Sequence, residues 1–309
     1  MKRRDFLKNT AASSTLLGLG SLPLNSFTSL GKTGSVKKLT ILHTNDVHSH
    51  IDPFPATDPR NPNQGGVPRR AAIIEKIRRE EQNVLLLDAG DIFQGTPYFN
   101  YYGGELEFKL MSMMKYDVAT IGNHDFDNGI DGLYAQLPHA NFDFVSANYD
   151  FKNTILNSHI KPYKILKRDG IKIGVFGLGI QLEGLVDKKL YKETIYNDPV
   201  TVAQDMSRIL KEEEKCDLVI CLSHIGFNYK EDPNKVCDIS LAKKTKNIDI
   251  IIGGHTHTFL DKPVVEKNLN GEEVLINQVG CYGINLGRID IYFDDAKNIA
   301  AAGGKKIVI

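Results

Sequence analysis

The 309-residue chain carries 38 Lys and Arg residues against 38 Asp and Glu residues, so its formal net charge is zero. This balance argues against recognition of nucleic acid by overall charge, which needs a basic face. Hydrophobic residues make up 41% of the chain, enough for a sizeable core, and no apolar run approaches the ~20 residues that a transmembrane helix needs.

The chain begins with a segment that resembles an export signal. Arg3 and Arg4 are followed by the run Phe6–Lys8 and then by a weakly apolar stretch rich in Ser and Gly. A charged start before an apolar stretch is typical of a signal peptide. The paired arginines resemble the twin-arginine signal, which carries folded proteins across a bacterial inner membrane. We therefore expect residues 1–31 to be a twin-arginine export signal and the protein to be periplasmic or secreted. A basic N-terminus without a targeting role is the alternative.

Short apolar runs then alternate with amphipathic stretches that have helical spacing. In chain order, the expected elements are strand Leu39–His43, helix Arg69–Glu81, strand Val84–Asp88, helix Leu106–Met114, strands Asp117–Ile121, Phe142–Ala147 and Lys172–Leu178, helix Val200–Glu214, strand Leu218–Leu222, helix Leu241–Lys246 and strand Asp249–Ile252. Val274–Val279 and Ile284–Phe293 alternate like antiparallel strands. Because continuously apolar strands belong to sheets that are covered on both faces, we expect a layered α/β sandwich. It should form a single domain over residues 36–309, closed by a C-terminal meander.

The four cysteines do not form a C-x-x-C pair, so a thiolate zinc site is not favoured. They are Cys216, Cys221, Cys237 and Cys281. Cys216 and Cys221 flank a strand an odd number of positions apart, which places them on opposite faces and prevents them from pairing. We expect buried free thiols.

Polar side chains follow five of the expected strands. These are Asp46 and His48 in T-N-D-V-H, Asp91 in D-A-G-D, Asn123, His124 and Asp127 in G-N-H-D-F-D, His224 in S-H-I-G, and His255 and His257 in G-G-H-T-H. The carboxyl ends of strands in open α/β sheets gather ligands at one edge. Asp, His and Asn supply the oxygen and nitrogen atoms that suit zinc, manganese or iron. Each motif alone is common, but the ordered set predicts one metal centre, with adjacent glycines such as Gly90 and Gly122 allowing close approach of the backbone.

This set resembles the calcineurin-like metallophosphoesterases, and more narrowly the catalytic N-terminal domain of the 5′-nucleotidase and UDP-sugar hydrolase family. The runs Ile41–His48 (ILHTNDVH), Gln64–Arg70 (QGGVPRR) and Gln278–Asp290 (QVGCYGINLGRID) look like that branch, and the resemblance extends from Leu39 to Phe293. It implies a layered αββα sandwich. It also implies a hydrolase with two divalent metal ions (Zn, Mn or Fe) that cleaves phosphate monoesters of nucleotide catabolism, 5′-nucleotides or related small phosphates, by attack of a metal-bridging hydroxide.

The same resemblance implies a role for each strand-end residue. The expected ligands are Asp46, His48 and His257 for one metal ion and Asn123, His224 and His255 for the other, with Asp91 bridging both. His124 is expected beside the phosphate, where it stabilises charge or protonates the leaving oxygen. Asp127 is expected to orient its ring.

Members of this branch usually continue into a C-terminal domain that holds the nucleobase. Because the chain ends at Ile309, we expect that nucleotide-specificity domain to be absent, and a separate chain that resembles it is a candidate partner. Alternatives on the same site are a cyclic-nucleotide phosphodiesterase, a UDP-sugar hydrolase, a sulfur-ester hydrolase or a catalytic subunit that needs a specificity subunit. A non-catalytic metal-binding subunit would predict a damaged ligand set, yet every expected ligand is present.

Other residues near the motifs permit two readings. His43 is expected in the core, and His50 is expected to be a solvated loop residue rather than a ligand. Arg69 or Arg70 could reach a substrate phosphate or simply start a helix. The aromatic run Tyr98–Tyr102 could line the pocket, although packing under a helix start is favoured.

Overall fold

The elements expected from the apolar pattern are present in the computed structural model, which describes residues 36–309. The expected export signal, residues 1–31, lies outside the described residues. Residues 34–309 form one compact unit. In the described part of this unit, no helix has both the length and the apolar character needed to cross a membrane.

The first of two six-stranded sheets has the order β14-β13-β1-β2-β3-β4. Its strands are β1 (Lys37–Thr44), β2 (Val84–Asp88), β3 (Val118–Ala119), β4 (Asp143–Phe144), β13 (Asn285–Phe293) and β14 (Ile299–Val308). Strands β1 to β4 are parallel, whereas β13 is antiparallel to both β1 and β14. The loops that follow β1, β2 and β3 therefore leave the sheet at the same edge.

The second sheet has the order β11-β12-β10-β9-β7-β6. Its strands are β6 (Tyr163–Arg168), β7 (Ile171–Gly179), β9 (Leu218–His224), β10 (Ile250–Gly253), β11 (Val264–Lys267) and β12 (Glu273–Asn277). The four central strands are parallel, and β6 and β11 are antiparallel edge strands. The short strands β5 (Tyr149–Asp150) and β8 (Ile195–Tyr196) pair separately.

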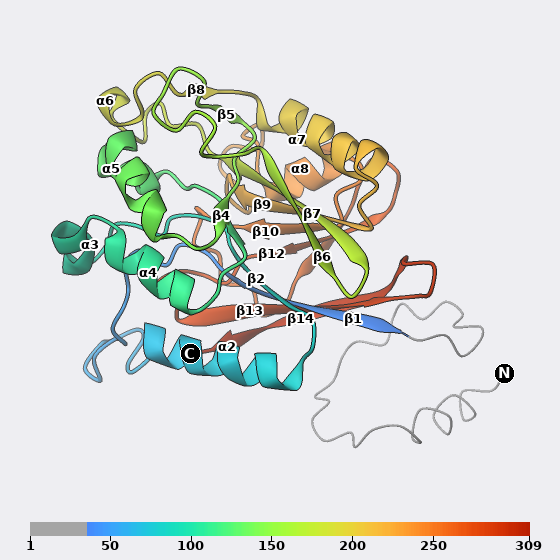
Figure 1. Ribbon diagram of the computed structural model, residues 1–309, viewed down its shortest axis with the longest axis horizontal. Helices are drawn as coiled ribbons and strands as arrows, with labels where there is room; N and C mark the ends of the chain where they lie inside the picture. Colours follow the sequence, from blue (N-terminus) through green and yellow to red (C-terminus); the bar gives the residue numbers. More distant parts are fainter. Residues whose placement is uncertain (1–35) are drawn as a thin grey trace. The chain divides into compact units, whose positions relative to one another are not determined.

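Strand alternation divides the core into three layers, and Figure 1 shows the two sheets with helices on their outer sides. Successive side chains of a strand point to opposite faces, so Leu85 and Leu87 of β2 pack between the two sheets while Leu86 packs against helices. Helices α2 (Val67–Glu80), α4 (Glu105–Met113) and α5 (Gly129–Gln136) cover the first sheet, and α7 (Pro199–Arg208) and α8 (Asp238–Lys244) cover the second. Two short helices, α3 (Pro97–Tyr102) and α6 (Lys188–Tyr191), connect these elements. The expected αββα sandwich is confirmed.

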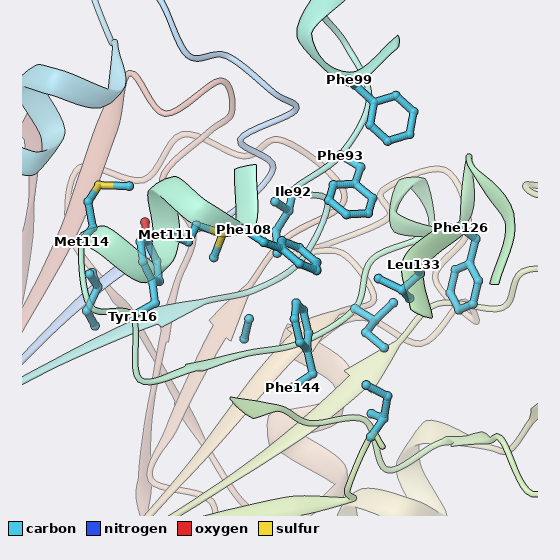
Figure 2. Packing of buried hydrophobic residues seen from close by; sticks show 14 of the residues in the cluster. Ile92, Phe93, Phe99, Phe108, Met111, Met114, Tyr116, Phe126, Leu133 and Phe144 are labelled. Carbon is cyan, nitrogen blue, oxygen red and sulfur yellow. The ribbon is translucent and has the colours of Figure 1, made fainter. Parts of the chain in front are cut away.

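An aromatic cluster connects the helical layer to the loop after β2 (Figure 2). The Phe108 ring of α4 lies 4.9 Å from the Phe93 ring of that loop and 5.1 Å from the Phe144 ring of β4, measured between centroids. Gly104, just before α4, has a φ of 102°, and a Cβ there would overlap the Phe93 ring. This packing fixes the start of α4 against the loop that carries Asp91.

The expected C-terminal meander is wrong. Strand β12 pairs with β10 and β11 in the second sheet, whereas β13 pairs with β1 and β14 in the first. Alternating burial reports that one face of a strand is exposed, but it does not identify the neighbouring strand. The expected helix Val200–Glu214 is α-helical only to Arg208 and continues as a π-helical turn, Ile209–Glu213.

The expectation of buried free thiols is confirmed for all four cysteines. The argument from opposite faces is wrong, however. Cys216 and Cys221 both pack in the core between the second sheet and its helices, because Cys216 precedes β9 and does not follow its alternation.

Candidate metal centre

Seven expected ligands lie together where the carboxyl ends of the two sheets meet. Asp46 and His48 follow β1, Asp91 follows β2, Asn123 follows β3, His224 ends β9, and His255 and His257 follow β10. Their ligand atoms form two groups that could each hold a metal ion: Asp46, His48 and His257, and Asp91, His224 and His255. Asn123 Oδ1 lies 2.9 Å from His255 Nδ1 and so borders the second group.

The Asp91 carboxylate lies between the two groups. Its Oδ2 atom is 3.0 Å from Nε2 of His224 in the second group and 3.8 Å from Nε2 of His48 in the first. The Asp46 Oδ1 atom is 3.2 Å from His257 Nε2 and 4.0 Å from the Nε2 atoms of both His48 and His224. Asp91 therefore belongs to the second group and also lies close to an imidazole of the first.

The unpaired atoms of this cluster fit a metal ion. His224 is fully buried, and its Nδ1 atom lies 2.7 Å from the Ala89 carbonyl, which fixes the ring. Its Nε2 atom has no hydrogen-bond partner among the described residues, although the Asp91 carboxylate is close. His48 Nδ1 is similarly held by the Phe93 carbonyl at 3.2 Å. Imidazoles fixed through one nitrogen and aimed through the other are typical of metal ligands, and the nitrogen and oxygen donors suit zinc, manganese or iron.

Opposite charges are concentrated in the cluster. Burial opposes protonation of His224, but the Asp91 and Asp46 carboxylates raise its pKa to about 10. Burial likewise opposes protonation of His257, and the Asp46 carboxylate raises its pKa to about 10. In turn, the imidazoles outweigh the effect of burial on Asp91 and lower its pKa below the ordinary value. A divalent cation would replace these protons as the positive charge that the carboxylates face.

Several expected ligands have left-handed backbone conformations. Asp46, His48, Asp91, His255 and His257 all have φ between 49° and 70°. Non-glycine residues in this region carry strain of order 1–3 kcal/mol each and persist only where the surroundings hold them. Here the loops hold one another, because the His48 N–H donates to the Asp91 carbonyl at 3.1 Å and the His255 N–H donates to the Asp46 carboxylate at 3.0 Å.

A buried carboxylate that the sequence analysis did not assign organises the loop after β2. Asp125 accepts the backbone N–H groups of Asp91, Ile92, Phe93 and Gly122 at 2.8–3.1 Å. Burial and the nearby Asp91 raise its pKa, and the donors from Gly122 and Phe93 oppose that rise. A Cβ at Gly122 would overlap the Asp91 carboxylate. Asp125 stands inside the G-N-H-D-F-D motif, but its partners are set by the tertiary fold.

His124 borders the two groups without belonging to either. Its side chain is 38% exposed, and its Nδ1 atom lies 2.8 Å from Asp127 Oδ2. This contact raises the pKa of His124. Burial opposes the rise, and the negative charge of Asp91 adds to it. The His124 N–H donates to Asp91 Oδ1 at 2.8 Å. The ring is therefore presented at the rim of the centre, with Asp127 behind it.

Two of the ambiguous histidines are resolved. His43 is fully buried beside Asn277, as expected for a core residue. His50 lies in a loop and outside both ligand groups, as expected, but it is only partly exposed, because its ring stacks 4.9 Å from Phe54 and packs 4.4 Å from Tyr282. Tyr282 is distant in the sequence, so this contact could not be read from the local pattern.

The arginines and the aromatic run divide between the surface and the core. Arg69 donates to the Asn63 carbonyl at the surface, whereas Arg70 is buried. In the aromatic run, Phe99 is buried but Tyr101 is 87% exposed. Packing under the start of a helix therefore holds for Phe99 and not for Tyr101.

Comparison with known proteins agrees with this geometry. The family model of the calcineurin-like phosphoesterases matches residues 39–259. The chain belongs to this family. It is 37% identical, over 83% of its length, to the trifunctional nucleotide phosphoesterase protein YfkN of Bacillus subtilis, and 34% identical, over 88% of its length, to a snake venom 5′-nucleotidase of Crotalus adamanteus. A 5′-nucleotidase precursor of Thermus thermophilus superposes with a TM-score of 0.80 and 31% identity over 88% of this chain.

This calcineurin-like phosphoesterase chain matches only part of each of these proteins. It spans 18% of the Bacillus protein, 48% of the venom nucleotidase and 55% of the Thermus chain. The match therefore identifies the domain described here and leaves the other half of the nucleotidase relatives without a counterpart in the alignment.

Asp125→Asn should loosen the loop that carries Asp91, because an amide N–H would then face backbone donors. We expect a loss of about 1–3 kcal/mol in the free energy of unfolding, the usual effect of an unsatisfied buried donor, together with reduced metal content. Urea unfolding and elemental analysis measure both. The control is Asp131→Asn, whose exposed carboxylate pairs with Lys192 at the surface. Equal behaviour of the two variants would show that Asp125 does not organise the centre.

Proposed function

We propose that this chain hydrolyses phosphate monoesters with two divalent metal ions. The observation that carries the proposal is the Asp91 carboxylate, whose Oδ2 atom lies 3.0 Å from His224 Nε2 in its own group and 3.8 Å from His48 Nε2 in the other. Membership of the calcineurin-like phosphoesterase family supports it. When bound, two divalent ions would polarise a phosphoryl group and supply a nucleophilic water at neutral pH.

The chain's own residues divide the work of holding this pair. We assign Asp46, His48 and His257 to the first ion and Asn123, His224 and His255 to the second, with Asp91 shared. The Asp125 carboxylate holds the Asp91 backbone, and the Ala89 carbonyl holds the His224 ring. These contacts keep the ligands in place before a substrate arrives, which is the condition for electrostatic stabilisation of a transition state.

His124 is assigned to the substrate rather than to a metal ion. Its ring is part-exposed beside the two groups, and Asp127 holds Nδ1, so Nε2 is free to face the ester. A protonated Nε2 can donate to the leaving oxygen as the ester bond breaks, and Asp127 favours that protonated state. The proton passes from His124 to the departing alcohol, and solvent restores it.

The metal requirement is the first test of this function. Purified protein should bind about two divalent ions per chain. Chelation should abolish phosphatase activity, because the carboxylates and imidazoles of the two groups cannot themselves polarise the phosphoryl group as a metal ion would. Asp91→Asn should weaken both sites together, more than any other ligand change. Asp261→Asn, at the exposed side chain that pairs with Lys306, is the control. Full activity in metal-free protein would refute the proposal.

Replacement of His124 tests its assignment to the substrate. His124→Ala should lower kcat roughly 10²- to 10⁴-fold, the span of a positioned acid–base group, while metal content stays near that of the wild type. Asp127→Asn should have a smaller effect, since it only releases the ring. The part-exposed His139 provides a control variant, His139→Ala. Loss of a metal ion from His124→Ala would make His124 a ligand instead.

We further propose that the substrate is a 5′-nucleotide or a related small phosphate. Selectivity for the nucleoside part needs a region like the other half of the nucleotidase relatives, supplied by a separate chain or segment. The partial coverage of those relatives supports this. Base stacking by such a region is worth ~1–3 kcal/mol, or roughly 5- to 150-fold.

The kcat/KM of this chain for AMP should therefore be close to that for ribose 5-phosphate. The panel should include a cyclic nucleotide and a UDP-sugar, because one relative is named trifunctional. A preference for AMP above roughly a thousandfold, beyond the stacking range, would place a base pocket in this domain.

Export by the twin-arginine route is also proposed, on the strength of Arg3 and Arg4. Because that route carries folded proteins, the metal ions could load in the cytoplasm before transport. The double variant Arg3→Lys and Arg4→Lys should keep the protein in the cytoplasm as a precursor, as measured by fractionation of the host cells. Unchanged export of the double variant would disprove the route.

A further inference from the structure

A small cavity lies under the loops of the metal centre, between the first sheet and helices α2 and α4. Its volume is about 10 Å³, and its lining includes Arg70, Asp88, Glu107 and Tyr116. Several of its apolar walls are labelled in Figure 2: Ile92, Met111 and Met114. A cavity of ~10–15 Å³ holds one water molecule when polar groups are there to bind it.

Two of the lining side chains are buried with unmet hydrogen-bonding capacity. Arg70 is 2% exposed, and its Nε and Nη1 atoms have no partner among the described residues. Glu107 is 3% exposed, and its Oε2 atom is also without a partner there. The two Asp88 oxygens, by contrast, already accept from Thr44 and Gly90. Because buried polar groups are almost always satisfied, the cavity should contain an acceptor for the Arg70 N–H groups and a donor for Glu107 Oε2.

We propose that a water molecule bound in this cavity accepts a hydrogen bond from the Arg70 guanidinium and donates one to Glu107 Oε2, and that this linked pair positions the loops of the first metal group. The part about the metal group rests on the proposed function. The pair is a positioning device and does not touch the substrate.

Glu107 connects the pair to the loop after β1. Its Oε1 atom accepts the Ser49 hydroxyl at 2.5 Å. Ser49 directly follows His48, and both residues have left-handed backbones, with φ of 54° and 49°. The hydrogen bond from Ser49 to the α4 side chain therefore holds a strained turn next to an expected ligand.

Arg70 connects the pair to the loop before β13. Its guanidinium packs against Gly283, where a Cβ would overlap Nη1. The neighbouring Tyr282 N–H donates to the Asp46 carbonyl at 2.7 Å. Glu107 thus contacts Ser49, the residue after His48, and Arg70 packs against Gly283, the residue after the Tyr282 that binds Asp46. Asp46 and His48 both belong to the first metal group.

Substituting both residues together separates a role in stability from a role in positioning the metal ligands. A pair that only stabilises the fold would change Tm, whereas a pair that positions the ligands would also change metal affinity. Removing one member leaves the other charge buried and unpaired, so Arg70→Leu and Glu107→Leu should each lower Tm. Replacing both by apolar residues removes that penalty, so the double variant should recover much of the Tm that each single variant loses, although the buried Ser49 hydroxyl still lacks its Glu107 acceptor. Its first metal site should still be weakened roughly 10- to 100-fold, the usual effect of losing a group that orients a ligand.

The test is titration of the metal-free protein with Mn²⁺, combined with thermal unfolding. Glu107→Gln keeps an amide oxygen for Ser49 and should retain most of the affinity that Glu107→Leu loses. Arg79→Leu, on the exposed side of α2, is the matched control and should change neither Tm nor affinity. A double variant that is more stable than either single variant and binds two Mn²⁺ ions as tightly as the wild type would overturn the positioning role. A wild type that binds no Mn²⁺ would instead refute the proposed function.

A crystal structure of the protein tests the water molecule itself. The expected result is one ordered water within ~2.7–3.2 Å of an Arg70 nitrogen and of Glu107 Oε2. A direct contact between the guanidinium and the Glu107 carboxylate, with no water between them, would overturn the proposed link.

Discussion

The centre depends on the placement of one buried carboxylate, that of Asp91, between imidazoles from both sheets. An isolated buried carboxylate is strongly disfavoured, so such a group needs positive charge or hydrogen-bond donors around it. Asp91 has His224 on one side, His48 on the other and the His124 N–H at 2.8 Å. Two cations in the same place would satisfy it more completely, and the rest of the site is arranged around that requirement.

The surrounding backbone shows how such a charge cluster is kept from relaxing. Left-handed residues after β1, β2 and β10 are locked by hydrogen bonds between loops, and Asp125 gathers several N–H groups of the β2 loop. Underneath, Phe108 of α4 packs on Phe93 of the same loop. The strain is local and the restraint comes from the whole fold, which is the arrangement expected of a preorganised site.

The sequence was informative where local pattern and strand polarity decide the outcome. Continuously apolar strands predicted the layers, and the carboxyl-end rule placed Asp46, Asp91 and His224 at one edge before any contact was known. It was not informative where the partner is distant. The pairing of β12 with β10, the packing of His50 against Tyr282 and the N–H donors of Asp125 all depend on which segments meet in space. The proposed link between Arg70 and Glu107 also joins distant segments. The position of each residue in its own helix gives no sign that the two side chains line the same cavity.

The measurement that tests the account most directly is the electron paramagnetic resonance spectrum of protein loaded with two Mn²⁺ ions per chain. If Asp91 is shared, two bound Mn²⁺ ions would lie close enough for their spins to couple. A carboxylate shared by both ions predicts a broad, exchange-coupled spectrum that Asp91→Asn abolishes. A six-line spectrum of isolated Mn²⁺ at full loading, unchanged by that substitution, would contradict it.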